Sequence, residues 1–87
     1  MVSKKVTVIN AQGFHMRPAT VFATEMGKFE ATVTLEVGGN PVNGKSLMTI
    51  IAACIKCGTE VNVVCDGADE QAALDKAVEM IESGLGE

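Results

Sequence analysis

The spacing of hydrophobic and polar residues changes several times along the chain, and each change predicts a new element. Residues 6–9 (VTVI) and 32–37 (TVTLEV) are rich in β-branched residues and alternate in polarity, which is typical of strands. Residues 60–65 (EVNVVC) alternate in the same way. A glycine-rich turn separates 32–37 from a short strand over 41–43, so these two strands form a predicted hairpin. Pro41 lies in the short strand and favours an edge position for it.

Two other segments repeat their apolar residues three and four positions apart, which predicts helices. The first helix is expected to have Pro18 in its first turn and to end at Gly27, with the stripe Ala19, Phe22, Ala23 and Met26. The last follows Asp69, its expected cap, and has the stripe Leu74, Ala77, Val78, Ile81 and Leu85. A short helix over 47–53 lies between them, with Ser46 as its N-cap.

The order of these elements, βαββαβα, indicates the fold. An antiparallel sheet with helices on one face buries every apolar stripe and leaves the other face in water. We therefore expect an α+β open-faced two-layer sandwich, with a four-stranded antiparallel sheet and three helices on one face. The 87 residues are enough for one modest core, so residues 1–87 are expected to form a single domain. Ile50, Ile51 and Ile55 are expected to fill that core.

Charge and composition exclude several classes of function. The net charge is −4 and the chain has no Trp or Tyr, which argues against binding to nucleic acid or to an anionic membrane. No apolar run approaches the roughly 20 residues of a membrane span, and the first ten residues lack the apolar region of a signal peptide. Three cysteines, an odd number, suit a reducing compartment. We expect a cytoplasmic protein without membrane insertion.

The scarce special residues of the chain gather in one stretch, GFHMRPA at 13–19, which holds the only histidine and the only arginine. The first N–H groups of a helix lack internal partners, so the helix start expected here favours an anion and keeps His15 neutral. Arg17 adds a forked cation for phosphate oxygens, and Pro18 fixes the first turn. The residues alone leave two interpretations open, a polar helix cap and a nucleophile beside a phosphate site. Neither needs a metal or another cofactor, because one histidine without nearby acids makes none of the usual sites.

A second motif, NGKSLM at 43–48, lies in register with the first. Together they resemble the HPr family, the histidine-containing phosphocarriers of the bacterial sugar phosphotransferase system. The resemblance covers essentially the whole chain, including the hairpin GGNPVNGKS and the start of the last helix, GADEQAAL. It implies a monomeric carrier rather than an enzyme. His15 would take a phosphoryl group from enzyme I on the ring nitrogen nearer the backbone and pass it to an EIIA unit of a sugar permease.

The same resemblance gives roles to neighbouring residues. Arg17 corresponds to the arginine beside the phosphate and Pro18 to the proline that starts the helix, whereas Met16 departs from the pattern because a smaller residue is common there. Ser46 matches the serine that an HPr kinase/phosphorylase modifies in relatives from low-GC Gram-positive bacteria. That modification slows transfer through the histidine and allows a catabolite-repression regulator to bind.

An apolar surface is expected beside His15, formed by Met16, Thr20, Leu47 and Met48. Exposed apolar side chains near a reactive group favour a docking surface, and methionine adapts to several partners. Two alternatives remain open: a regulatory binding module that acts mainly through phospho-Ser46, and a carrier in a nitrogen-related phosphotransfer chain.

A C-x-x-C motif at 54–57 receives no function from the sequence. Thioredoxin-like chemistry would require it at the start of a long helix after a strand, and here it follows a short helix. A zinc site needs four ligands, and only Cys65 and His15 would remain as candidates. We interpret the cysteines as packing residues or unreactive thiols.

Overall fold

A computed structural model of the chain describes residues 1–9, 13–14 and 16–84. The described elements are β1 (Val2–Thr7), α1 (Met16–Met26), β2 (Thr32–Val37), β3 (Asn40–Asn43), α2 (Leu47–Ala52), β4 (Glu60–Asp66) and α3 (Glu70–Glu82). This order is the predicted βαββαβα.

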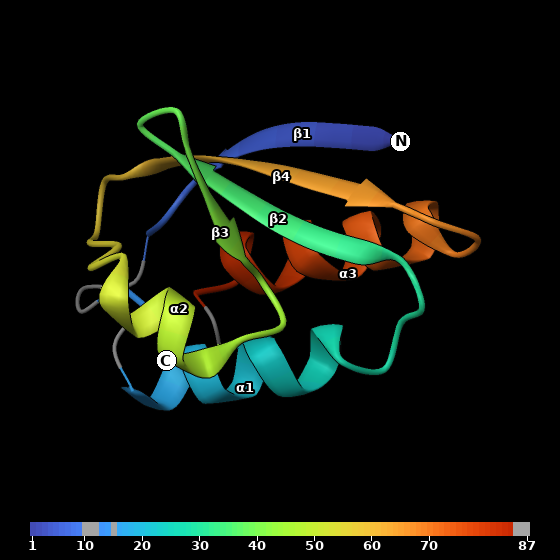
Figure 1. The fold of residues 1–87 in the computed structure, drawn as a ribbon. Helices are drawn as coiled ribbons and strands as arrows, with labels where there is room; N and C mark the ends of the chain where they lie inside the picture. The colour runs from blue at the N-terminus through green and yellow to red at the C-terminus, as the bar shows by residue number, and fades with distance from the viewer. Residues whose placement is uncertain (10–12, 15, 85–87) are drawn as a thin grey trace.

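The four strands form one antiparallel sheet in the order β1-β4-β2-β3. β4 lies between β1 and β2, which come earlier in the chain, so the sheet is held together by pairing over long sequence distances. β3 lies at an edge, as Pro41 predicted. The three helices lie on one side of the sheet (Figure 1). The predicted open-faced two-layer sandwich is confirmed.

The core lies between the sheet and the helices, and the apolar patterns account for it. Val61, Val63 and Cys65 of β4 alternate toward the helices and are buried. On the helical side, the fully buried side chains include Phe22 and Met26 of α1 and Ile81 of α3. Of the three isoleucines expected inside, Ile50 and Ile55 are buried, whereas Ile51 is half-buried against the core.

Two predictions were wrong in detail. The first strand was expected over 6–9 but runs from Val2 to Thr7, because its extent follows backbone pairing with β4, from Val2↔Cys65 to Thr7↔Glu60. Lys4 and Lys5 face solvent on this edge strand, so its first half carries little apolar signal.

Asp69 was expected to cap the last helix. It occupies the N-cap position of α3 but makes no side-chain capping bond. Its carboxylate instead accepts the backbone N–H groups of Glu30 at 2.9 Å and Ala31 at 2.7 Å. The prediction for Leu85 in the same helix lies outside the described residues.

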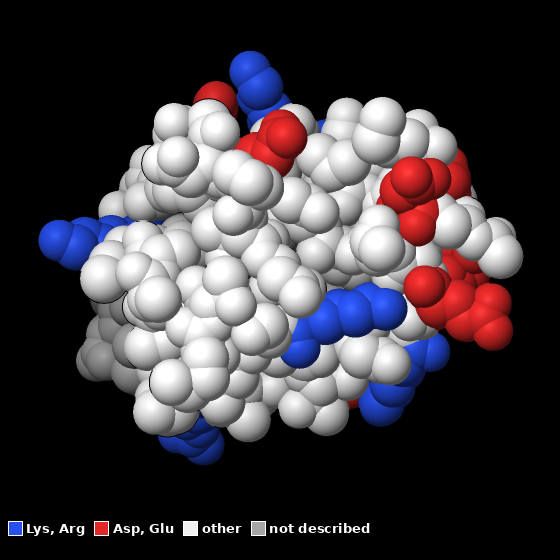
Figure 2. All heavy atoms as spheres, in the orientation of Figure 1, with Lys and Arg blue, Asp and Glu red and all other residues white. Residues whose placement is uncertain are grey.

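Charged side chains are unevenly distributed over the face shown in Figure 2. Acidic groups gather at the end of the molecule where β4 passes into α3. The surface over α2 and β3 is largely uncharged. The least charged part of this face therefore coincides with the helix that follows Ser46.

Candidate functional site

The first turn of α1 holds Arg17 and Pro18, two of the predicted site residues. The helix begins at Met16, and Arg17 is exposed on its first turn. Pro18 is the third helical residue and is buried, at a position where its missing N–H removes no bond from the helix. Pro18 thus lies in the first turn of the helix, and its role in the site stays a prediction. His15 directly precedes the helix in sequence, and the prediction for its side chain lies outside the described residues.

Arg17 forms no ion pair with a carboxylate in the part of the chain that the structure describes. Among the described residues, its guanidinium therefore has no carboxylate that would compete with an external anion. A forked set of donors in this state is suited to a phosphoryl group, because two parallel N–H···O bonds form to one oxyanion.

The segment just before His15, Gly13 and Phe14, contacts the core and the loop that contains Ile55. Phe14 is buried and packs edge-on against Phe22 of α1, with ring centroids 5.2 Å apart and an interplanar angle of 90°. The backbone N–H of Phe14 donates to the carbonyl of Ile55 at 2.9 Å. Gly13 has φ +60°, and a Cβ added there would lie only 2.3 Å from the same carbonyl oxygen.

These supporting residues were not predicted as part of the site. Phe14 is one of only three aromatic residues and adjoins the histidine, which was an available signal. Nothing in the sequence indicated Ile55 as its partner, because the two residues are 41 positions apart (55 − 14).

Ser46 is the N-cap of α2, as predicted. Its backbone is extended, with φ −108° and ψ 111°, and its side-chain oxygen accepts the N–H of Thr49 at 3.4 Å. The Thr49 hydroxyl donates to the same oxygen at 2.8 Å, a contact that the sequence did not reveal. The Ser46 side chain is half-buried.

The four residues expected to form a docking surface lie on two helices that pack side by side, α1 and α2 (Figure 1). Met16 is 61% exposed and Met48 75% exposed, which is unusual for such large apolar side chains. Thr20 is exposed and its hydroxyl donates to the Met16 carbonyl at 2.7 Å, whereas Leu47 is half-buried against the core. Two accessible methionines therefore lie on neighbouring helices, and their union in one docking surface beside His15 stays a prediction.

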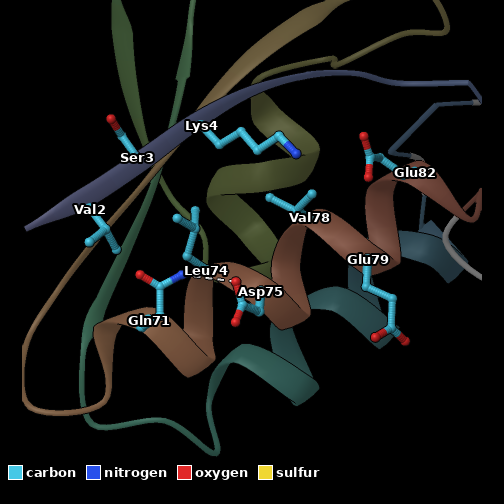
Figure 3. A pocket seen from close by; sticks show the side chains of 9 residues that line it. All are labelled: Val2, Ser3, Lys4, Gln71, Leu74, Asp75, Val78, Glu79 and Glu82. Carbon is cyan, nitrogen blue, oxygen red and sulfur yellow. Dashed lines mark hydrogen bonds between the residues drawn. The ribbon is translucent and has the colours of Figure 1, made fainter.

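A groove elsewhere on the molecule is separate from these residues. It lies between β1 and α3, where Val2 and Lys4 face Leu74 and Val78 (Figure 3). None of the predicted site residues that the structure describes lines this groove. Within residues 1–9, 13–14 and 16–84, no three His, Cys, Asp or Glu side chains come together as a possible metal site. Over the same ranges no helix is long and apolar enough to span a bilayer.

Comparison with known proteins decides the family. Residues 2–83 match the protein family described as "PTS HPr component phosphorylation site". The chain belongs to the HPr family.

Individual relatives of this HPr-family chain include two kinds of protein. It is 42% identical to the HPr-like protein Crh of Bacillus subtilis over 76 residues, which cover 87% of this chain and 89% of that protein. It is 36% identical to the phosphocarrier protein HPr of Haemophilus influenzae over 81 residues, or 93% of this chain and 95% of that protein.

Solved structures agree with this assignment. HPr-C-His from Thermoanaerobacter tengcongensis matches with a TM-score of 0.95 at 33% identity, covering 100% of this chain and 98% of the other. A crystal structure of Crh, described as a catabolite-repression protein of Bacillus subtilis and as a dimer with a swapped domain, matches with a TM-score of 0.77 at 38% identity, covering 95% of each chain.

Proposed function

We propose that this HPr-family chain carries phosphoryl groups on His15, from phosphorylated enzyme I to an EIIA unit of a sugar permease. The family match over residues 2–83 is the observation that most supports the proposal, because GFHMRPA lies within the matched range. The start of α1 at Met16 and the exposure of Arg17, which has no ion pair with any described residue, agree with an anion at this position.

The transfer consists of two successive displacements at phosphorus, one from enzyme I to His15 and one from His15 to EIIA. The neutral ring nitrogen of His15 attacks the phosphoryl group of enzyme I, the bond from phosphorus to the donor breaks, and a nitrogen–phosphorus bond forms. Arg17 offsets the charge of the transferred group. In the second step a nucleophile of EIIA attacks the same phosphorus and His15 leaves with its lone pair restored. The chain is itself phosphorylated by one partner and dephosphorylated by the other, so it acts as a carrier and not as an enzyme.

Incubation with enzyme I and phosphoenolpyruvate tests this function. We expect the chain to gain one phosphate that is stable in base and labile in acid, measured by intact mass. The variant His15→Ala should gain none, while Ser46→Ala should be labelled like the original chain. Acid-labile phosphate on His15→Ala would contradict the proposal.

Arg17 is expected to affect the transfer rate but not the fold. Arg17→Ala should slow phosphorylation by enzyme I about tenfold to hundredfold, because a donor to the transferred group is lost. The phosphorylation rate of Arg17→Lys should lie between those of the original chain and Arg17→Ala, because lysine keeps the charge but lacks the forked geometry. The free energy of unfolding of both variants should lie within about 0.5 kcal/mol of that of the original chain, because the side chain is exposed and forms no ion pair with the residues that the structure describes. An unchanged transfer rate in Arg17→Ala would remove Arg17 from the site.

We infer a second, regulatory function at Ser46. The relationship to Crh, which is described as a catabolite-repression protein, favours it, and the half-buried Ser46 oxygen precedes a largely uncharged surface. Phosphorylation by an HPr kinase/phosphorylase would add about two negative charges there, slow transfer through His15 and create a site for a catabolite-repression regulator. Kinase and ATP should label the chain with acid-stable phosphate and leave Ser46→Ala unlabelled. An unlabelled original chain would remove this function and leave the carrier function intact.

The partners follow from the carrier function. Enzyme I and EIIA would dock on the apolar surface of Met16, Thr20, Leu47 and Met48, in the cytoplasm, without nucleic acid or cofactor. Reconstitution with sugar-branch and nitrogen-branch partners in parallel distinguishes the two phosphotransfer chains by rate.

Light scattering should give one species at 9.1 kDa, since the core is complete within one chain. A stable species of twice that mass would instead support a dimer such as the one described for Crh.

A further inference from the structure

We propose that Cys54 and Cys57 form a thiol-modification site that slows phosphoryl transfer by displacing the segment next to His15. The modifying reagent would be a small-molecule disulfide. This inference rests on the proposed carrier function for its consequence, but not for its structural effect. It differs from the thioredoxin-like and zinc chemistry that the sequence argued against, since neither the start of a long helix nor four ligands are required.

Both thiols are accessible. Cys54 and Cys57 are exposed and free of disulfides, whereas Cys65 is buried in the core. Packing therefore does not explain the first two, although it does explain Cys65. Cys54 also has φ 52°, a left-handed backbone conformation that residues other than glycine rarely adopt. Among the described residues it is the only non-glycine with a positive φ.

The residue between the two cysteines holds the segment that leads to His15. Ile55 is buried, and its carbonyl accepts the N–H of Phe14 at 2.9 Å. Gly13 packs so closely that an added Cβ would lie 2.3 Å from the Ile55 oxygen and 2.7 Å from the Cα of Lys56. There is no spare room between the two segments. A change in the backbone of 54–57 must therefore move Gly13 and Phe14.

Residues 57–59 of the same loop also bond to the segment that follows β1, Val8 and Ile9. The N–H of Gly58 donates to the carbonyl of Val8 at 2.8 Å, and the N–H of Val8 donates to the carbonyl of Thr59 at 3.0 Å. The thiol of Cys57 lies 3.7 Å from the carbonyl oxygen of Ile9 and donates to it. An adduct on this sulfur removes the S–H donor and adds bulk against Ile9. Two stretches that precede His15 in the sequence, residues 8–9 and 13–14, are thus bound to the loop that carries the thiols.

The chemistry is thiol–disulfide exchange and needs no other oxidant. The thiol of Cys54 or Cys57 loses its proton to solvent, and the resulting thiolate attacks one sulfur of the small disulfide. The disulfide bond of the reagent breaks, a mixed disulfide forms on the protein, and the other half of the reagent leaves as a thiolate that takes up a proton. An excess of small thiol reverses the exchange and restores the free cysteine.

Oxidised glutathione is a suitable probe on the full chain. We expect a mixed disulfide at Cys54 or Cys57, located by peptide mass, and at least a fivefold slower phosphorylation of His15 by enzyme I. Dithiothreitol should restore the rate. The double variant Cys54→Ser/Cys57→Ser is the matched control: it should be phosphorylated at the rate of the original reduced chain and should not respond to oxidised glutathione.

A structural readout separates this inference from the carrier function. The modified chain should show faster hydrogen exchange at the amide of Phe14, because its bond to Ile55 is weakened, while the amides of β4 stay protected. If the reduced chain is not phosphorylated at all, the carrier function fails, and the exchange measurement still decides whether the thiols act on Phe14. The inference is overturned if no mixed disulfide forms, if Cys54 and Cys57 join to each other instead, or if the adduct changes neither the exchange nor the rate.

Discussion

At the scale of single residues, the segment before His15 depends on two neighbours with different tasks. Phe14 anchors the segment in the core through Phe22, and Gly13 allows the backbone to approach Ile55 in a left-handed conformation. From the sequence, a glycine at this position predicts a loop with conformational freedom. The structure assigns it a stricter requirement, because both its conformation and the space around it exclude a side chain.

Two glycines with the same backbone angle separate these two requirements. Gly13 has φ +60° and Gly38 has φ +59°, but an added Cβ meets nothing within 4 Å at Gly38. Gly38→Ala should therefore cost about 1–2 kcal/mol, the conformational penalty alone. Gly13→Ala should cost about 1–3 kcal/mol more, because the backbone of the Ile55–Lys56 segment must move. Urea unfolding with an unchanged slope measures both, and equal losses would contradict the close contact.

At the scale of elements, α2 is the shortest of the described helices, and Ser46 caps its start. It spans six residues, from Leu47 to Ala52, and only Ile50 is fully buried. So short a helix is marginal by itself and depends on packing and capping. The N-cap was correctly predicted from Ser46, since the motif for it is local in sequence. The additional hydroxyl contact from Thr49 depends on a side-chain rotamer and was not.

Substitutions in α1 and at the cap of α2 should have different effects on stability. Ser46→Ala removes the N-cap of α2 and should lower the free energy of unfolding by about 1 kcal/mol. Thr20→Ala removes a hydroxyl that bonds back to the Met16 carbonyl inside α1, and should leave stability equal or slightly higher because alanine is the better helix former. Thermal unfolding checks both. If Thr20→Ala unfolded at as low a temperature as Ser46→Ala, the hydrogen bond from Thr20 to the Met16 carbonyl would be a stabilising contact. A Thr20 variant would then be unsuitable for testing whether partners dock on this residue.

At the scale of the whole molecule, contacts between distant segments join the two layers. β4 pairs on both sides with strands from the first half of the chain, and α3 packs against β1 and β4. Asp69 adds a polar link, from the start of α3 to the backbone just before β2. The N–H groups of Glu30 and Ala31 that bond to its carboxylate lower the pKa of Asp69 below its ordinary value.

This link predicts a loss of stability in acid. A carboxyl group whose pKa is lower in the folded than in the unfolded state stabilises the fold above the unfolded pKa, about 3.9. That contribution disappears as the pH falls from there through the folded pKa. Asp69→Asn should thus be less stable than the original chain at pH 7, and the difference should shrink below about pH 4. Asp75→Asn is the control, since among the described residues the Asp75 side chain bonds only to Gln71, within the same helix. A difference that is constant with pH would mean that the Asp69 charge is not involved.

The sequence by itself determined the order of elements, the apolar face of each helix, the edge position of β3 and the N-cap of α2. These features depend on residues within a few positions of each other, so periodicity and motif reveal them. Tertiary structure alone decided that β1 starts at Val2, that Asp69 bonds to the 30–31 backbone, and that Ile55 supports Phe14. Each of these joins residues about 40 or more positions apart, where the geometry depends on how the completed layers pack. The motif around His15 and Arg17 could be read from the chain, but the loop that holds it in place, with its two exposed thiols, became visible only in the fold.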